Sequence, residues 1–231
     1  MGAFTPGTAR IREGVLYTGF IEYKEDDEPS YLRSGSLHAI AASNGAKQWS
    51  TNAVVHDIAV PDGDYLYLSS SVASSEPPDR WQRLTKVRKD TGETIEFLYE
   101  ERSSDTFNGL LVVGGTLVAK QRDTLLAFSL SNNERLWSHG DVDGYAIHNG
   151  TVYLVSDGLI ACDLDTGDQL WSSSTATDGP RDPDFGQPRI QDEFILIRDR
   201  DDNTVYVYDT DGTVVRDYRI TDTLGGPQSS P

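Results

Sequence analysis

One segment recurs along almost the whole chain, and this repeat limits what the chain can fold into. In its clearest copy, residues 150–165, apolar and polar residues alternate around an Asp-Gly turn, and a Thr-Gly turn then leads to Trp171. Alternation on both sides of tight turns is typical of short antiparallel strands joined by hairpins. The repeat therefore predicts a chain built of small antiparallel sheets.

The copies can be aligned on one residue of the turn that precedes the last strand. These marker residues are spaced by 47, 41, 34 and 45 positions along the chain, and they are Gly45, Gly92, Asn133, Gly167 and Gly212. Four residues after each marker stand, in order, Trp49, Glu96, Trp137, Trp171 and Arg216. Six residues before each marker stand Ala39, Lys86, Ala127, Ala161 and Tyr206.

A period of this length with four short strands per unit is typical of propeller blades, which bury their faces by stacking on neighbours around an axis. No segment shows a sustained period of 3.6 residues, which argues against helical repeats. We predict an all-β propeller of five four-stranded blades, with rim loops at residues 25–30 and 69–78 and a flexible tail at 221–231. It forms either a closed ring or a fragment of a seven- or eight-bladed ring. The predicted blades span residues 7–52, 53–101, 106–139, 144–175 and 186–220.

The pattern Ala161-x-Asp163-x-x-Thr166-Gly167-x-x-x-Trp171 resembles the tryptophan-docking repeat of the PQQ-like, or quinoprotein-type, β-propellers. In that family the tryptophan packs against the turn of a neighbouring blade, so the resemblance implies a structural role and not a ligand-stacking one. The residues to which it assigns this role are Trp49, Trp137 and Trp171, with the turn glycines Gly45, Gly92, Gly167 and Gly212.

The resemblance implies a fold more firmly than an activity, because propellers carry unrelated functions. Family members include quinoprotein alcohol dehydrogenases, an outer-membrane assembly lipoprotein and sensor domains fused to kinases. The dehydrogenases hold PQQ with calcium beside a disulfide between adjacent cysteines. Cys162 is the only cysteine here, and we find no basic cluster suited to the quinone. We therefore expect no cofactor, with PQQ and calcium as the alternative.

The net charge of the chain limits the kinds of partner that it can bind. The chain carries 37 Asp and Glu against 20 Lys and Arg, a net charge of −17, spread along its length, which argues against nucleic acid. Asp outnumbers Glu by 26 to 11 and Arg outnumbers Lys by 15 to 5, a composition typical of haloarchaeal proteins. Short hydrated carboxylates keep a surface wetted where the Debye length falls to about 3 Å. The alternative is an acidic mesophilic protein.

The sequence lacks an apolar run of the ~20 residues that a membrane helix needs, and its first residues lack the features of a signal peptide. We expect a monomer without a transmembrane segment. It stays where it is made, or an export signal lies outside this chain and takes it to the cell surface or beyond.

Residues before or within the first strand of successive blades would line the mouth of a central channel. They are His56, Asp57, Asp105, Asp143, Tyr145, His148, Asp184 and Phe185. If the blades bring them together, the mouth is a carboxylate-rich funnel that attracts cations or cationic peptides. The alternative is a water-filled channel without a ligand.

Other residue types give little sign of chemistry. The acidic turns lack the full spacing of a calcium loop, and Asp and Gly are also what hairpin turns require. The four histidines form no paired zinc motif, and no nucleophile elbow or phosphate loop is present. We expect a non-enzymatic scaffold for protein interaction, assembly or ligand binding, with a quinone-dependent dehydrogenase, or a remnant of one, as the alternative.

The composition generates a prediction about salt. Folding should need molar KCl or NaCl, because carboxylates repel one another unless counterions screen them. The melting temperature, followed by circular dichroism, should rise between about 0.1 M and about 2 M salt. A melting temperature that stays constant or falls would contradict the halophilic interpretation.

Overall fold

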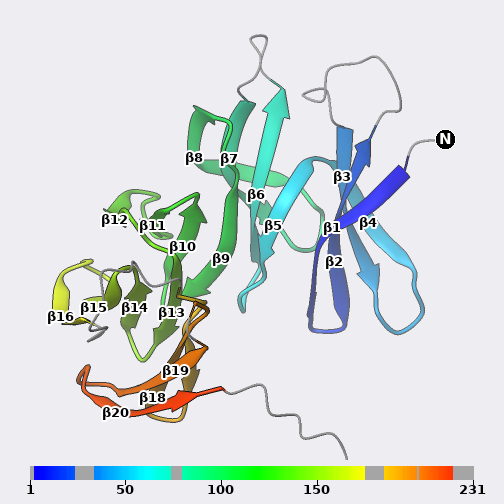
Figure 1. Cartoon of the computed structure of the whole chain (residues 1–231). Helices are drawn as coiled ribbons and strands as arrows, with labels where there is room; N and C mark the ends of the chain where they lie inside the picture. Colours follow the sequence, from blue (N-terminus) through cyan, green and yellow to red (C-terminus); the bar gives the residue numbers. More distant parts are fainter. Residues whose placement is uncertain (1–2, 24–33, 74–79, 175–184, 202, 221–231) are drawn as a thin grey trace, which may run out of the picture. The chain divides into compact units, whose positions relative to one another are not determined.

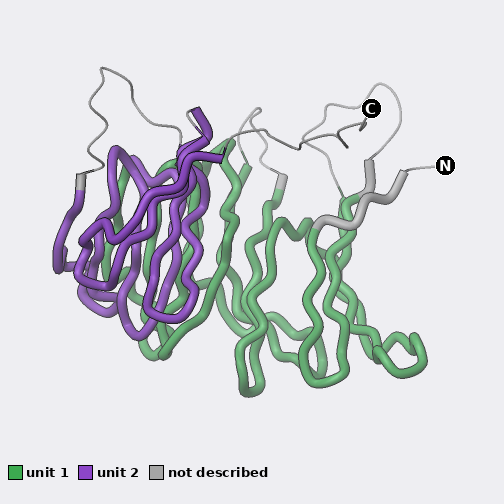
Figure 2. The backbone as a smooth tube through the Cα atoms, turned by 60° about the horizontal axis from the view of Figure 1, so that its bottom comes forward, with its two compact units in different colours: residues 1–140 green, residues 141–231 purple. Residues whose placement is uncertain are grey.

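The computed structural model describes residues 3–23, 34–73, 80–174, 185–201 and 203–220. These form two compact units, residues 1–140 and 141–231, which Figure 2 shows in two colours and which are treated separately below. The predicted loop at residues 25–30 and the predicted tail at 221–231 lie outside the described residues.

Each unit consists of four-stranded antiparallel sheets whose strands follow one another in chain order (Figure 1). Unit 1 has three sheets: β1 (Ala3–Arg12), β2 (Val15–Tyr23), β3 (Ser34–Ala41) and β4 (Lys47–Asn52); β5 (Val54–Ala59), β6 (Tyr65–Ala73), β7 (Arg80–Arg88) and β8 (Thr94–Ser103); β9 (Phe107–Val113), β10 (Thr116–Gln121), β11 (Thr124–Ser129) and β12 (Arg135–His139). Unit 2 has two sheets: β13 (Gly144–His148), β14 (Thr151–Val155), β15 (Gly158–Asp163) and β16 (Gln169–Ser174); β17 (Arg189–Gln191), β18 (Phe194–Asp199), β19 (Thr204–Asp209) and β20 (Val214–Arg219). The prediction of an all-β chain with five four-stranded blades is confirmed.

One predicted loop is wrong in part. Residues 69–73 continue strand β6 and pair with β7, so that the insertion is shorter than residues 69–78. Serine-rich sequence is typical of loops, but here Ser69, Ser70 and Ser71 are buried. Ser69 donates a hydrogen bond from its hydroxyl to the Phe107 carbonyl at 2.5 Å. Small hydroxyl side chains thus suit a strand that is covered by the next sheet.

Apolar side chains fill the spaces between successive sheets within each unit. One cluster in unit 1 joins the first two sheets, with Tyr17 and Leu37 against Ile58 and Leu66. A second joins the next two sheets, and in unit 2 a third joins the two sheets there. A single sheet of this size cannot bury its faces alone, so each sheet depends on its neighbour for stability.

The third and fourth strands of every sheet pair with a shift of register, which lies at the same place in the repeat in the first four sheets and one residue later in the fifth. In three sheets the shift follows a pair of alanine and tryptophan, namely Ala39 with Trp49, Ala127 with Trp137, and Ala161 with Trp171. These alanines are fully buried. A bulge of this kind bends the strand and redirects the side chains beside it.

The indole rings of two of these tryptophans contact the turn of the next sheet. Trp49 donates a hydrogen bond from Nε1 to the Lys89 carbonyl at 2.7 Å, and Trp171 donates one to the Thr210 carbonyl at 2.9 Å. A Cβ atom added to Gly92 or to Gly212 would lie 2.5 Å from Cε3 of the facing indole. Only glycine leaves room for the ring at these two turns, and both have a positive φ that glycine adopts without strain.

Glu96 occupies the tryptophan position in the second sheet and makes a polar version of the same contact. Its Oε1 accepts a hydrogen bond from Lys86 Nζ at 2.9 Å within the sheet. Its Oε2 accepts one from Nδ2 of Asn133, the marker residue of the next sheet, at 2.6 Å. The Lys-Glu pair therefore replaces the alanine-tryptophan pair, and the side chain still reaches the following turn.

A comparison of two glycines tests the contact with Trp49. Gly92→Ala and Gly45→Ala both place alanine at a positive φ, 75° and 72°, but a Cβ on Gly45 meets nothing within 4 Å. Gly45→Ala should lower the free energy of unfolding by about 1 kcal/mol from backbone strain. Gly92→Ala should lower it by about 1–3 kcal/mol more, because the methyl group displaces the indole. Equal losses in denaturant titrations of the two variants would contradict the packing argument.

Candidate functional site

The predicted mouth residues that the structure describes lie in or before the first strands of four of the five sheets, and none belongs to the sheet β1–β4. In unit 1, His56 and Asp57 lie in β5 and Asp105 precedes β9; in unit 2, Asp143 precedes β13, Tyr145 and His148 lie in β13, and Phe185 precedes β17 and pairs with Asp199. Asp184 lies outside the described residues. The structure thus divides the predicted set between two units.

Within unit 1, Asp57 connects the first strands of three successive sheets. Its side chain accepts hydrogen bonds from Arg10 Nη2 at 3.0 Å and Thr8 Oγ1 at 3.4 Å in β1, and from the backbone N–H of Ile58 at 2.8 Å in β5. The other carboxylate oxygen accepts the N–H of Leu110 in β9 at 2.9 Å. Asp57 is 7% exposed, so these bonds form largely away from water and are stronger for it.

The other two mouth residues of unit 1 also have polar contacts. His56 Nε2 lies 2.9 Å from the Ser71 hydroxyl. Asp105 uses its backbone: its N–H donates to Ser103 Oγ at 3.1 Å, and its carbonyl accepts from Gln121 Nε2 at 2.9 Å. Of the three, Asp57 alone has a carboxylate that joins separate sheets.

In unit 2, Gln187 connects the first strands of its two sheets. Gln187 Oε1 accepts the backbone N–H of Tyr145 at 2.9 Å. A Cβ on Gly144 would lie 2.9 Å from the same Oε1 atom, so this close approach needs glycine. Sequence reasoning did not single out Gln187, because an isolated amide before a strand carries no recognisable pattern. Its place near the start of a repeat was the one available signal.

The acidic turns use their carboxylates to cap the backbone. Asp163 Oδ1 accepts the N–H groups of Asp165 and Thr166 at 3.0 and 2.9 Å, and the bond from Thr166 contributes most to lowering the pKa of Asp163. Asp209 Oδ1 likewise accepts the N–H groups of Asp211 and Thr213. Hydrogen bonds from backbone N–H groups stabilise the charged form of a carboxyl group.

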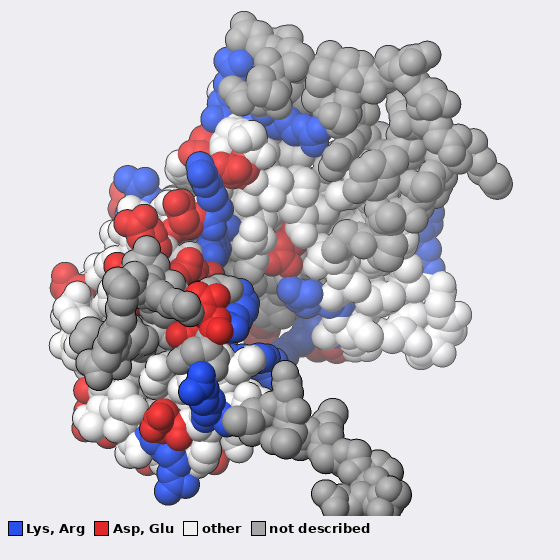
Figure 3. All heavy atoms as spheres, viewed as in Figure 1, with Lys and Arg blue, Asp and Glu red and all other residues white. Residues whose placement is uncertain are grey.

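The described residues bring together no group of three or more His, Cys, Asp or Glu side chains that could hold a metal ion. Figure 3 shows acidic and basic side chains interspersed on the face in view.

Cys162 lies fully buried in β15. Burial raises the pKa of its thiol, and the nearby Asp168 raises it further. A thiol acts as a nucleophile in its deprotonated form, so this environment disfavours reactivity. The side chain packs as a small apolar group.

Comparisons with known proteins bear on the repeat. A family model described as outer membrane protein assembly factor BamB matches residues 78–173. No curated protein matches the chain. The resemblance of the repeat to the PQQ-like propellers is thereby confirmed for the matched segment, which covers parts of both units.

Solved structures share the fold at low sequence identity. A europium-containing methanol dehydrogenase matches with a TM-score of 0.63 and 11% identity over 95% of this chain and 53% of its own. The quinohemoprotein alcohol dehydrogenase ADHIIG from Pseudomonas putida HK5 matches at 0.61 and 15%, over 92% and 41%. Hsv2 from Kluyveromyces lactis matches at 0.59 and 13%, over 94% and 63%. The chain thus spans less than two thirds of each of these proteins, and the likeness concerns the fold alone.

Among the described residues, no helix is long and apolar enough to cross a bilayer. All the regular structure that they form consists of the strands given above.

Replacing Asp57 tests its role as a connection between sheets. Asp57→Ala should lower the free energy of unfolding by about 3 kcal/mol, because it leaves the N–H groups of Ile58 and Leu110 without partners. Asp105→Ala is the control, since that residue makes its hydrogen bonds through the backbone, and it should change stability by less than about 0.5 kcal/mol. Similar losses in urea titrations of both variants would contradict the role of the Asp57 carboxylate.

Proposed function

We propose that this chain is a non-enzymatic propeller scaffold that binds a partner protein through the outer face of the sheet β17–β20. The inner face of that sheet packs against β13–β16, with Ile195, Ile197 and Tyr208 buried against Tyr153. The outer face has no such cover among the described residues. Its exposed apolar side chains are the observation that supports the proposal.

The outer face presents large apolar groups side by side. Phe194, Val215 and Tyr218 are 44%, 51% and 49% exposed. Together with Val207 and Arg216 they line a hollow of about 370 Å³. Contiguous exposed apolar side chains around a hollow are typical of an interaction surface, whereas isolated ones are common on any protein.

Arg216 indicates the chemistry of the partner. It occupies the position in the repeat at which Trp49 and Trp171 reach the turn of a following sheet. Arg216 Nη1 donates to the Tyr218 hydroxyl at 2.8 Å, and the guanidinium lies 5.6 Å from the centre of that ring. A cation beside an aromatic ring on an apolar surface favours a partner segment that has apolar side chains and a carboxylate.

The composition is consistent with such an apolar interface. Molar salt screens contacts between exposed charges, while salts that are excluded from the protein surface strengthen apolar burial. A scaffold in concentrated salt therefore gains more from an apolar contact than from a charged one. The matching family model is described as an assembly factor, which supports a role in assembly at the level of the family.

The competing function is that of a quinone-dependent dehydrogenase or a remnant of one. The likeness to two dehydrogenases supports it only through the fold. Titrating the full chain with PQQ and calcium in high salt separates the two functions. Tight stoichiometric binding with reduction of a dye by alcohols or aldoses would contradict the scaffold proposal.

Site-specific crosslinking tests the surface. A photocrosslinking residue in place of Val215 should give one discrete adduct with a single protein in cells that make the full chain. The same residue in place of Leu170, which is also exposed in unit 2, is the control and should give none. Phe194→Glu should abolish the Val215 adduct without changing the melting temperature, because the side chain is exposed.

The partner identified in this way should then bind the purified chain, and Phe194→Glu should weaken that binding at least about tenfold. Absence of an adduct from Val215, or equal adducts from both positions, would contradict the proposal.

A further inference from the structure

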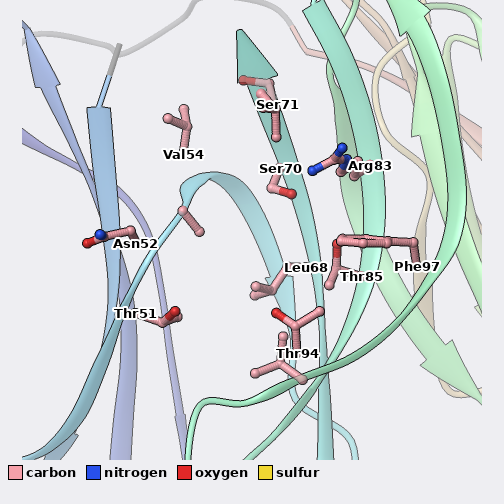
Figure 4. Close-up of a pocket in the computed structure, with 13 residues that line it drawn as sticks. Thr51, Asn52, Val54, Leu68, Ser70, Ser71, Arg83, Thr85, Thr94 and Phe97 are labelled. Carbon is pink, nitrogen blue, oxygen red and sulfur yellow. The ribbon is translucent and has the colours of Figure 1, made fainter.

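A pocket in unit 1 opens between the end of β4 and strands β6, β7 and β8, as Figure 4 shows. Its volume is about 150 Å³. A cavity of this order holds a molecule the size of benzene, that is, about six or seven non-hydrogen atoms. The pocket therefore has room for a small molecule of about this size.

A buried hydroxyl in the pocket has no hydrogen-bond partner in the structure. Thr85 is 4% exposed, and its Oγ1 bonds to no other described residue. A buried hydroxyl without a partner costs about 1–3 kcal/mol, so a water molecule or a ligand atom at this position is favoured. Leu68 and Val87 line the same pocket and add an apolar surface beside the hydroxyl.

The single charged side chain among the pocket-lining residues is that of Arg83. Its Nε donates to the Glu100 carboxylate, and its guanidinium lies 4.7 Å from the centre of the Phe97 ring. These two contacts orient the guanidinium, while its two Nη nitrogens have no partner within the described part of the chain. In Figure 4 the nitrogens of Arg83 extend toward Ser70 on the pocket side.

The residues that line the pocket differ in charge from the chain as a whole, although Glu100, which is not among them, pairs with Arg83. The chain has a net charge of −17, yet no Asp or Glu lies among the residues that line the pocket. An arginine held by a neighbouring carboxylate and an aromatic ring can offer both Nη nitrogens to a carboxylate in a two-pronged arrangement. The pocket thus combines an anion-binding group, a hydroxyl and an apolar wall.

We propose that this pocket binds a three-carbon hydroxycarboxylate. The carboxylate accepts hydrogen bonds from the Arg83 Nη nitrogens, a ligand hydroxyl pairs with Thr85 Oγ1, and the carbon chain lies against Leu68 and Val87. Glycerate, with seven non-hydrogen atoms, matches the volume. The site lies in unit 1, apart from the protein-binding face proposed for unit 2, and either assignment can fail without the other.

Calorimetric titration of the full chain with three probes tests the chemistry. Glycerate carries both recognised groups, propionate lacks the hydroxyls, and glycerol lacks the charge. In about 2 M KCl, a salt concentration at which surface charges are screened, glycerate should bind with one site per chain. Its affinity should exceed that of either other probe by at least about tenfold. Equal affinities for glycerate and glycerol, or no saturable binding of glycerate, would overturn the proposal.

Variants assign the binding to the named groups. Arg83→Gln should lower glycerate affinity at least about tenfold, and Thr85→Val, which keeps the shape of the side chain, should lower it about fivefold. Arg88→Gln is the matched control. Arg88 lies in the same strand, pairs with Glu93 just before β8 and lies over Tyr65, but is not among the pocket-lining residues.

Unchanged glycerate affinity in both pocket variants would overturn the assignment. So would a loss in Arg88→Gln equal to that in Arg83→Gln. Thr85→Val removes a buried hydroxyl and should fold at least as well as the parent chain, which keeps the test informative if Arg83→Gln unfolds.

Discussion

Within each unit, a side chain of the fourth strand reaches the turn of the following sheet, and the stacking of the sheets depends on that contact. An alanine on the third strand leaves room for the indole, and a glycine in the following turn receives it, as with Trp49 and Gly92. The same geometry recurs at Trp171 and Gly212. Because the ring and the turn come from successive repeats, every added sheet covers an apolar face that its predecessor could not cover alone.

Contacts at the first strands complement these contacts of the fourth strands. Asp57 joins β1, β5 and β9 through hydrogen bonds to side chains and backbone, and in unit 2 Gln187, which precedes β17, accepts a hydrogen bond from β13. Sheets that are attached at both the first and the fourth strand cannot slide along each other without breaking both sets of contacts. Close-packed apolar clusters between them then favour one spacing.

The sequence predicted the parts of this structure that repeat. Alternating apolar residues and turn glycines at regular spacing were enough to predict five four-stranded sheets, and the resemblance to the tryptophan-docking repeat implied a structural role for Trp49 and Trp171. The prediction that Ser69 to Ser71 belong to a loop was wrong, because a serine-rich loop and a buried strand with small hydroxyl side chains have the same composition in a single sequence. A contact such as that of Gln187 with Tyr145 joins residues 42 positions apart and leaves no local pattern.

The pocket near Thr85 also could not be predicted from the sequence. Its lining comes from two sheets, and its defining feature is a hydroxyl that lacks a partner, which is a property of the packed structure and not of any segment. Threonine at that position is ordinary in a strand. Likewise, the sequence placed Glu96 in the tryptophan position but could not show that Asn133 would receive it.

Because Glu96 stands in the second sheet where the first has Trp49, the two boundaries between successive sheets of unit 1 have different contacts at the turn. At the boundary between its first two sheets an indole ring packs on a turn, while at the boundary between its second and third sheets the Asn133 amide donates a hydrogen bond to the Glu96 carboxylate, which Lys86 of the same sheet as Glu96 also contacts. Both boundaries also contain an apolar cluster, and salts that are excluded from the protein surface strengthen such burial while they screen the charge of Glu96. The exchange of tryptophan for glutamate therefore makes the turn contact of one boundary sensitive to ionic strength, while the packing that holds both boundaries together is not weakened by salt.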